Sequence, residues 1–347
     1  MGIEPVTQKD TIAIHFICAA VARLAPTTRD NILRAVAIPT ELLAQPQARV
    51  PAENFAALWL AVAREMDDEF FGLDSRRMKV GSFALLCHAV LDCVTLDQAI
   101  KAICHGFAMF LDDVQLRLQV QDDQALITVD NRISSPSDRL FADEALLVMV
   151  HGLMCWLVGK RMELRQAAFA APRPAHAAEY RLMFSQQLVF DAPLSAIFFD
   201  ARLLPSRVVA NRTTVRSFLR DAPQSVFVKY RNTDSWSARL RRRLRGSIGG
   251  HDWPLLQQVA AELRVTPTTL RRRLEAEGTS YQKLKDDLRR DAAVHYLCTT
   301  RISVAEVAGL LCFQDASAFR RAFKSWTGVQ PSRYRMADAA APSPGKR

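Results

Sequence analysis

The sequence predicts an α+β part over residues 1–205 and an all-α part over residues 251–337. Three observations carry this prediction: the hydrophobic period changes within the first part, a helix-turn-helix pattern occurs twice in the second, and charge is divided unequally between them. With 49% hydrophobic residues and only 13 Gly among 347, the chain is an ordinary globular one. This composition excludes collagen-like, low-complexity and wholly disordered chains.

The chain begins with helical segments that prolines separate. Proline is favoured at the first position of a helix. Pro26 therefore predicts the start of one helix, and Pro51 predicts the start of the next. The apolar pattern predicts two further helices, at residues 82–92 and 96–110.

The hydrophobic period then changes to alternation. Apolar and polar residues alternate strictly from Val114 to Val120, the polar residues 121–124 supply a turn, and residues 125–129 resume as a strand. This pattern predicts a β-hairpin with one face in water. The following elements are expected to be a helix and three short strands: residues 138–162, 167–170, 187–190 and 196–200. This mixture makes the first part α+β.

The longest uncharged run extends from Ala145 to Gly159 and includes His151. Its length falls short of the ~20 residues that span a bilayer, so we expect a buried core helix and no membrane segment. No basic stretch precedes the apolar residues near the N-terminus, so we expect no signal peptide and a cytoplasmic protein.

The net charge of +10 lies wholly in the C-terminal third. Residues 1–225 carry 23 basic and 25 acidic groups, net −2, and residues 226–347 carry 23 and 11, net +12. A basic module beside a near-neutral one favours a polyanion-binding unit attached to a unit with another role. We therefore expect a fragment from Asp234 to Arg335 to bind duplex DNA by itself.

The all-α part repeats a helix, a tight turn and a second helix at a separation of about 49 residues. In the first copy, Asp252 is expected to cap a helix that ends at Leu263, and Thr266 with Pro267 starts a helix that stops at Gly278.

In the second copy, Ser303 and Glu306 form a capping box, and a helix then runs to Leu311. After the turn, the next helix is expected to start at Asp315 and to end at Gly328. The apolar spacing packs the two helices of each copy together and leaves the outer face of the second helix exposed.

These outer faces and their N-terminal ends hold the candidate DNA-binding residues: Thr266, Thr268, Arg271, Arg272, Ser317, Arg320 and Arg321. Guanidinium groups can bond guanine O6 and N7 in the major groove, while hydroxyls and helix N-termini can hold phosphates. One cationic helix is usually only a solvated face, but a repeated one inside two capped units points to DNA. Arg273 and Arg290 are as well suited to phosphates or solvent as to bases.

Between the copies, Thr279 and Ser280 cap a helix expected over residues 281–297. Its ~17 residues would span ~25 Å at 1.5 Å per residue. A connector of that length can hold two reading helices in successive major grooves, which lie ~34 Å apart.

Residues 252–335 resemble the DNA-binding domain of AraC/XylS-type transcription regulators. The segments that carry the resemblance are residues 270–281, 303–308, 318–328 and 331–335. The family pattern usually has Gly before the Phe of the second turn, whereas Cys312 precedes Phe313 here. If that position needs a positive φ, Cys312 is strained or the turn is reshaped.

The first part resembles the arabinose-binding N-terminal domain of AraC-type regulators. The segments concerned are residues 49–51, 71–73, 81–82, 95–99 and 184–194. The resemblance implies that this domain binds an unidentified small-molecule effector and dimerises the protein.

The expected domains follow from these assignments. Residues 1–225 form the α+β effector-binding and dimerisation domain, 226–250 an Arg- and Gly-containing linker, 251–337 the double helix-turn-helix domain and 338–347 a flexible tail. The arginines between 239 and 245 suit either a solvated helix end or linker, or direct contact with phosphates.

The sequence thus predicts a sequence-specific, effector-responsive transcription regulator, with activation favoured by the resemblance. Its expected partners are double-stranded DNA, the effector, RNA polymerase and a second copy of the chain, with no membrane and no cofactor.

An enzymatic or haem- and gas-sensing N-terminal domain is the alternative. The seven cysteines include no C-x-x-C pair, so we expect reduced core thiols and no metal site. A DNA-repair methyltransferase would resemble zinc-clustered cysteine proteins, whose spacing this chain lacks. The pairs Cys87-His88 and Cys104-His105 diverge on a helix, so we expect no catalytic residue. A haem sensor with His105 or His151 as axial ligand stays open.

Overall fold

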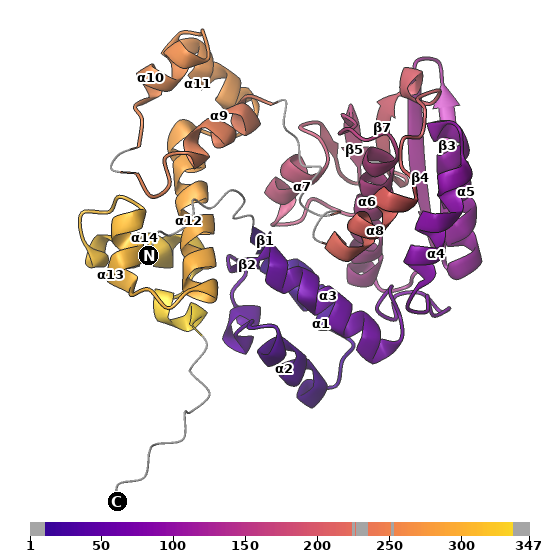
Figure 1. The fold of residues 1–347 in the computed structure, drawn as a ribbon, viewed down its shortest axis with the longest axis horizontal. Helices are drawn as coiled ribbons and strands as arrows, with labels where there is room; N and C mark the ends of the chain where they lie inside the picture. The colour runs from indigo at the N-terminus through magenta and orange to yellow at the C-terminus, as the bar shows by residue number, and fades with distance from the viewer. Residues whose placement is uncertain (1–10, 224–225, 227–234, 251–252, 336–347) are drawn as a thin grey trace, which may run out of the picture. The chain divides into compact units, whose positions relative to one another are not determined.

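The computed structural model describes residues 11–223, 226, 235–250 and 253–335. Asp252 and the expected tail 338–347 therefore lie outside the described residues. The chain forms two compact units (Figure 1). The first unit comprises the described parts of residues 1–17, 25–55 and 235–347, and the second those of 18–24 and 56–234. The domain limits expected at 225, 250 and 337 stay a prediction.

A five-stranded sheet with the order β3-β4-β7-β5-β6 lies in the second unit. The strands are β3 (Val114–Gln121), β4 (Gln124–Asn131), β5 (Gln166–Ala168), β6 (Leu188–Val189) and β7 (Ser195–Asp200). β5 and β6 are parallel, and the other neighbouring strands are antiparallel. The predicted hairpin is confirmed as β3 and β4, with Gln121 paired with Gln124 across a two-residue turn.

Helices accompany this sheet, with α5 packed against β3 and α6 against β4 and β7. The helical elements that lie wholly in this unit are α4 (Ser82–Ala89), η2 (Val90–Asp92), α5 (Leu96–Phe110), α6 (Pro136–Leu157), α7 (Ala177–Met183), η3 (Ala201–Leu203) and α8 (Arg212–Asp221). α8 was not expected from the sequence. Its start is a capping box between Asn211 and Thr214.

The long helix α6 is the core helix that the uncharged run predicts. It is long and apolar enough to cross a membrane by length and composition, but 94% of its apolar window is buried inside the protein. The buried residues of α6 include the polar Asp143, Glu144 and His151. α6 ends at Leu157, five residues before the expected end at Met162.

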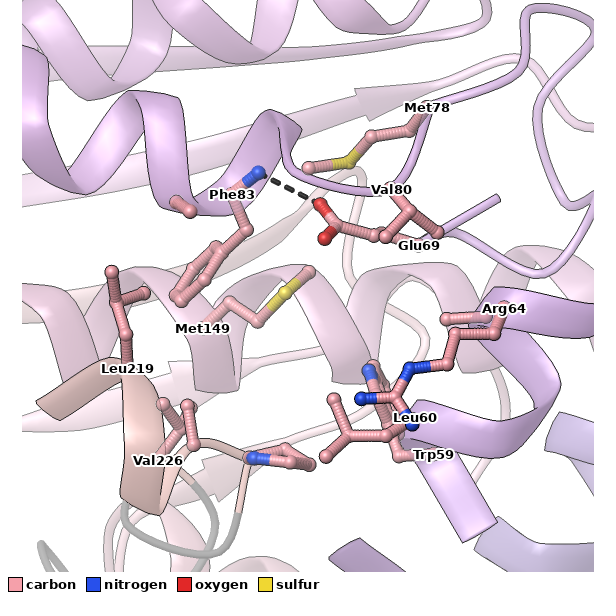
Figure 2. A pocket seen from close by; sticks show the side chains of 14 residues that line it. Trp59, Leu60, Arg64, Glu69, Met78, Val80, Phe83, Met149, Leu219 and Val226 are labelled. Carbon is pink, nitrogen blue, oxygen red and sulfur yellow. Dashed lines mark hydrogen bonds between the residues drawn. The ribbon is translucent and has the colours of Figure 1, made fainter. Parts of the chain in front are cut away.

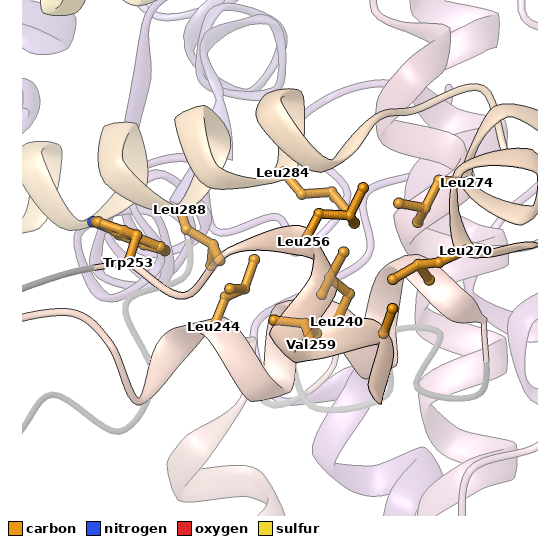
Figure 3. Close-up of a cluster of buried hydrophobic side chains, with 10 residues drawn as sticks. Leu240, Leu244, Trp253, Leu256, Val259, Leu270, Leu274, Leu284 and Leu288 are labelled. Carbon is orange, nitrogen blue, oxygen red and sulfur yellow. The ribbon is translucent and has the colours of Figure 1, made fainter. Parts of the chain in front are cut away.

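The first unit contains both predicted helix-turn-helix pairs. Its C-terminal elements are α9 (Trp236–Arg245), α10 (Leu256–Glu262), α11 (Pro267–Ala276), α12 (Tyr281–Thr299), α13 (Val304–Leu310), α14 (Ala316–Thr327) and η5 (Pro331–Tyr334). α9 lies within the expected linker 226–250. Because its Leu240 and Leu244 are fully buried with Leu270 and Leu274 of α11, α9 is part of this core (Figure 3).

N-terminal residues complete the first unit. Its further elements are β1 (Thr11–Ala13), α2 (Pro26–Ala35), η1 (Thr40–Ala44) and β2 (Arg49–Pro51). Two helices are divided between the units: α1 (Ile14–Val21) after Ile17, and α3 (Ala52–Met66) after Phe55. The helix starts predicted from the two prolines are confirmed, whereas the antiparallel pair β1-β2 was not expected.

Candidate nucleic-acid interface

Buried leucines pack the first candidate reading helix, α11, against its neighbours. Leu270 and Leu274 are fully buried against α9, α10 and α12 (Figure 3). The Thr266 hydroxyl accepts a hydrogen bond from the Thr269 amide at 3.1 Å, which makes Thr266 the predicted cap. Leucines one turn apart bury one face of α11 and leave the opposite face to solvent.

The second candidate reading helix, α14, is built the same way with aromatic residues. Phe319 and Phe323 are fully buried, with their ring centroids 5.6 Å apart. The Asp315 carboxylate accepts from the Ala318 amide at 2.7 Å, and Gly328 ends the helix at φ 81°. The predicted capping box of Ser303 with Glu306 starts α13, the partner helix.

The structure places the predicted DNA-binding residues at exposed positions on α11, α14 and the α11 cap: Thr266, Thr268, Arg271, Arg272, Ser317, Arg320 and Arg321. Among the described residues, no carboxylate forms an ion pair with these four arginines. Guanidinium groups that form no ion pair with a carboxylate among the described residues are available to an external anion. Their contacts with DNA stay a prediction.

Other arginines of this unit are engaged internally. Arg241 pairs with Asp287 at 2.9 Å, and Arg243 pairs with Glu262. The Arg239 and Arg273 guanidinium groups lie 4.7 and 4.0 Å from the centroid of the Trp236 ring. Arg239, Arg241 and Arg243 of the arginine run therefore stabilise the fold through contacts within this unit. In this they differ from the arginines on the outer faces of α11 and α14.

Arg290 also belongs to the internal set, because it pairs with Asp287 at 3.1 Å and with Asp291 at 3.0 Å. Neither Arg273 nor Arg290 therefore resembles the exposed arginines of the reading helices.

The two reading helices differ in charge at their N-termini. The cap of α11 is the neutral Thr266, whereas the cap of α14 is Asp315. Hydrogen bonding from the Ala318 amide lowers the pKa of Asp315, so this cap is a carboxylate at neutral pH. A carboxylate occupies the anion-binding end of α14 and repels a phosphate there, so the N-terminus of α11 is the better phosphate site.

Helix α12 joins the two helix-turn-helix pairs. Its 19 residues would span about 28 Å at 1.5 Å per residue. The Arg289 guanidinium lies 5.1 Å from the Trp253 ring centroid and 5.2 Å from that of Phe313. Since Trp253 precedes α10 and Phe313 precedes α14, Arg289 ties both pairs to the connector.

Cys312, where the sequence departs from the family pattern, has a positive backbone φ. Cys312 has φ 57°, and Arg264, which has the same place in the first turn, has φ 55°. The Cys312 amide donates to Gly309 O and the Phe313 amide to Ala308 O, both at 3.0 Å. The turn therefore keeps its hydrogen bonds and Cys312 adopts the left-handed conformation, which is the strained alternative of the two expected.

A buried polar cluster anchors β1 and β2 on α12. The Thr11 hydroxyl donates to Asp291 Oδ1 at 2.7 Å, and Arg49 Nε lies 3.6 Å from the same oxygen. The Arg49 amide donates to the Tyr334 hydroxyl at 3.1 Å. Thr11, Arg49 and Asp291 are 0%, 5% and 8% exposed. Burial opposes ionisation of Asp291, but Arg290, Arg49 and Thr11 outweigh it and lower its pKa.

Sequence reasoning missed this cluster as a structural anchor. No local signal in the sequence connects residues 49–51 with Asp291.

The two histidines considered for the alternative haem site, His105 and His151, differ in their exposure to solvent. His105 is exposed. His151 is buried, its Nε2 donates to Met162 O at 2.9 Å, and the Cys155 thiol lies 3.5 Å from the same nitrogen. Burial lowers the pKa of His151 to about 4, so the ring is neutral at pH 7. His151 is a hydrogen-bonded core histidine.

The cysteines are free thiols at buried or half-buried positions. Burial raises the pKa of Cys104 to about 11 and that of Cys155 to about 12. Neither thiol ionises at neutral pH, so neither is an activated nucleophile.

Two family models match the chain: the N-terminal arabinose-binding domain of AraC transcription regulators over residues 27–208, and a helix-turn-helix domain over residues 259–337. The Ornithine utilization regulator of Pseudomonas aeruginosa is 30% identical over 312 residues, covering 89% of this chain and 91% of that one. An uncharacterized helix-turn-helix regulator of Mycobacterium tuberculosis is 29% identical over 345 residues, covering 93% and 94%.

The crystal structure of the regulator CdpR from Pseudomonas aeruginosa aligns at 23% identity and a TM-score of 0.32, covering 90% of this chain and 97% of that one. The match over residues 27–208 and the full-length Pseudomonas relative show the family. The chain is a DNA-binding transcription regulator, and it belongs to the AraC family with an arabinose-binding-type N-terminal domain.

Proposed function

We propose that the chain is an effector-responsive activator that reads two successive major grooves with α11 and α14. The observation that carries this proposal is the pair of capped helices whose outer faces hold Arg271, Arg272, Arg320 and Arg321, exposed and without a carboxylate partner among the described residues. The 19 residues of α12 give the connector a length close to the groove spacing.

The proposal includes further assignments. Residues 251–337 contact DNA, and the arabinose-binding-type domain binds a small molecule and dimerises the chain. RNA polymerase is the partner in activation, the protein works in the cytoplasm, and it is not an enzyme. The relatives support these assignments because they are transcriptional regulators.

Alanine substitutions test the base-reading role. Replacing Arg271, Arg320 or Arg321 with Ala should cost ~1–3 kcal/mol on a cognate site first identified by DNA footprinting, or roughly 5- to 150-fold in Kd, and leave binding to unrelated duplex nearly unchanged. Arg333→Ala is the matched control, because Arg333 is exposed on η5 and outside both reading helices. Kd values come from fluorescence anisotropy on both duplexes.

Equal losses on the cognate and the unrelated duplex would show that these arginines contact phosphates and not bases. Affinity of the unchanged protein for DNA should fall roughly 10³-fold or more between 50 and 200 mM salt, as expected for six or more phosphate contacts.

A further inference from the structure

A cavity of about 210 Å³ lies in the second unit between α3, α6, α8 and the segment that leads into α4 (Figure 2). Its walls are mostly apolar, with Trp59 from α3, Phe83 from α4, Met149 from α6 and Leu219 from α8. Small-molecule sites are typically such apolar cavities with a few placed polar groups.

Several side chains of the cavity wall are buried and packed against their neighbours. Trp59 is 6% exposed, and its ring makes an edge contact with Phe71 at 4.4 Å between centroids. Met78 is 1% exposed and Val226 6%. Such a wall needs little ordering when a ligand enters, which favours binding.

Two charged side chains line the cavity, and one of them already has partners. The Glu69 carboxylate accepts hydrogen bonds from the Gly81 amide at 2.8 Å and the Phe83 amide at 2.7 Å, the second of which is drawn in Figure 2. Burial raises the pKa of Glu69, and the two amide hydrogen bonds oppose this effect. Glu69 thus holds the start of α4 in place.

Arg64 is the other charged group. It is exposed, it lies on the wall formed by α3, and none of the described residues forms an ion pair with it (Figure 2). A guanidinium group beside an apolar surface binds a carboxylate through paired N–H donors and repels an amine.

We propose that this cavity is the effector site and that it takes a compact ligand with an apolar body and one carboxylate, which pairs with Arg64. The inference rests on the proposed effector response. A cavity of about 210 Å³ is smaller than the ~300–1,000 Å³ usual for drug-sized ligands, so the ligand is small.

Calorimetry on the full chain with three matched probes tests the proposal. Phenylacetate, phenylacetamide and 2-phenylethylamine share one ring and differ in charge. Phenylacetate should bind at least tenfold more tightly than the amide, and the amine should bind more weakly than the amide. Arg64→Gln should reduce phenylacetate affinity to that of the amide and leave amide affinity unchanged.

Two further variants locate the site. Arg216→Gln removes another exposed arginine, on α8 but outside the cavity lining, and should leave every affinity unchanged. Ala84→Leu places a larger side chain at a lining position and should abolish binding of acid and amide alike. The melting temperature of each variant without probe checks that it folds.

The inference is overturned if no probe binds, if acid and amide bind equally, or if Ala84→Leu or Arg64→Gln changes nothing. Binding of the footprinted DNA is measured on the same preparations. If DNA binding is intact in those cases, only the effector site is wrong; if Arg271→Ala and Arg320→Ala leave DNA binding unchanged, the proposed function fails separately.

Discussion

Cys312 has a backbone conformation that suits glycine. Its φ of 57° lies in the left-handed region, which costs an L residue ~1–2 kcal/mol relative to the right-handed one. The thiol donates to Gly250 O at 3.1 Å, but a thiol is a weak donor. The strain should therefore exceed what the thiol contact contributes.

We predict that Cys312→Gly raises the free energy of unfolding by up to about 1 kcal/mol, because glycine adopts positive φ without a Cβ clash. Cys312→Val should lower it, since a branched side chain is worse at this angle. Thermal melting of both variants against the unchanged protein measures the effect. A lower melting temperature for Cys312→Gly would mean that the thiol contact outweighs the strain.

At the scale of single elements, α6 buries two groups whose titrations have opposite effects on stability. Burial lowers the pKa of His151 to about 4 from 6.5, and burial raises that of Asp143 to about 6 from 3.8, although Ser195 and Asn131 donate hydrogen bonds to this carboxyl. Between pH 6.5 and 4 the unfolded histidine binds a proton that the folded one does not, so stability falls as pH falls. Asp143 has the opposite effect on stability. Between pH 6 and 3.8 the folded carboxyl binds a proton that the unfolded one does not, so stability rises as pH falls.

We predict that His151→Gln reduces the acid sensitivity of the protein. Glutamine can still donate to Met162 O but does not titrate, while Asp143 stays in both proteins. Acidification from pH 7.5 to 5 should cost the unchanged protein roughly 2 kcal/mol through His151, or several degrees in melting temperature, and the variant should escape this loss. Melting curves at both pH values measure it, and an equal drop in the two proteins would contradict the prediction.

At the scale of the whole molecule, the DNA-binding unit includes chain from both ends of the sequence. Asp291 of α12 is buried against Thr11 and Arg49, and Tyr334 of η5 accepts from the Arg49 amide. A fragment from Asp234 to Arg335 lacks β1 and β2. It therefore exposes α12 surface that these strands cover and leaves Asp291 without Arg49.

We predict that this fragment melts well below the full chain, contrary to the simple expectation of an independent DNA-binding fragment. In the full chain, Arg49→Met should lower the free energy of unfolding by roughly 3 kcal/mol, because a buried charge loses a partner. Arg34→Met, an exposed change on α2 of the same unit, should stay within about 0.5 kcal/mol. Thermal melting measures all three proteins; equal melting temperatures for the fragment and the full chain would show that the anchor is dispensable.

Helix α3 contributes residues to both units. α3 lines the cavity with Trp59 and Arg64, and its first residues, Ala52–Phe55, belong to the first unit. There Glu53 lies 3.6 Å from His295 of α12.

The sequence alone determined the elements whose signals are local. The caps Thr266 and Ser303, the stop at Gly278 and the hairpin of β3 and β4 all depend on residues within a few positions of one another, so pattern and capping chemistry predict them. Only the tertiary structure decided which arginines are paired, that α9 belongs to the helix-turn-helix core, and that β1 and β2 anchor α12. The contact of Thr11 with Asp291 joins residues 280 positions apart, and no local pattern encodes such a pairing because it arises only when the folded surfaces meet.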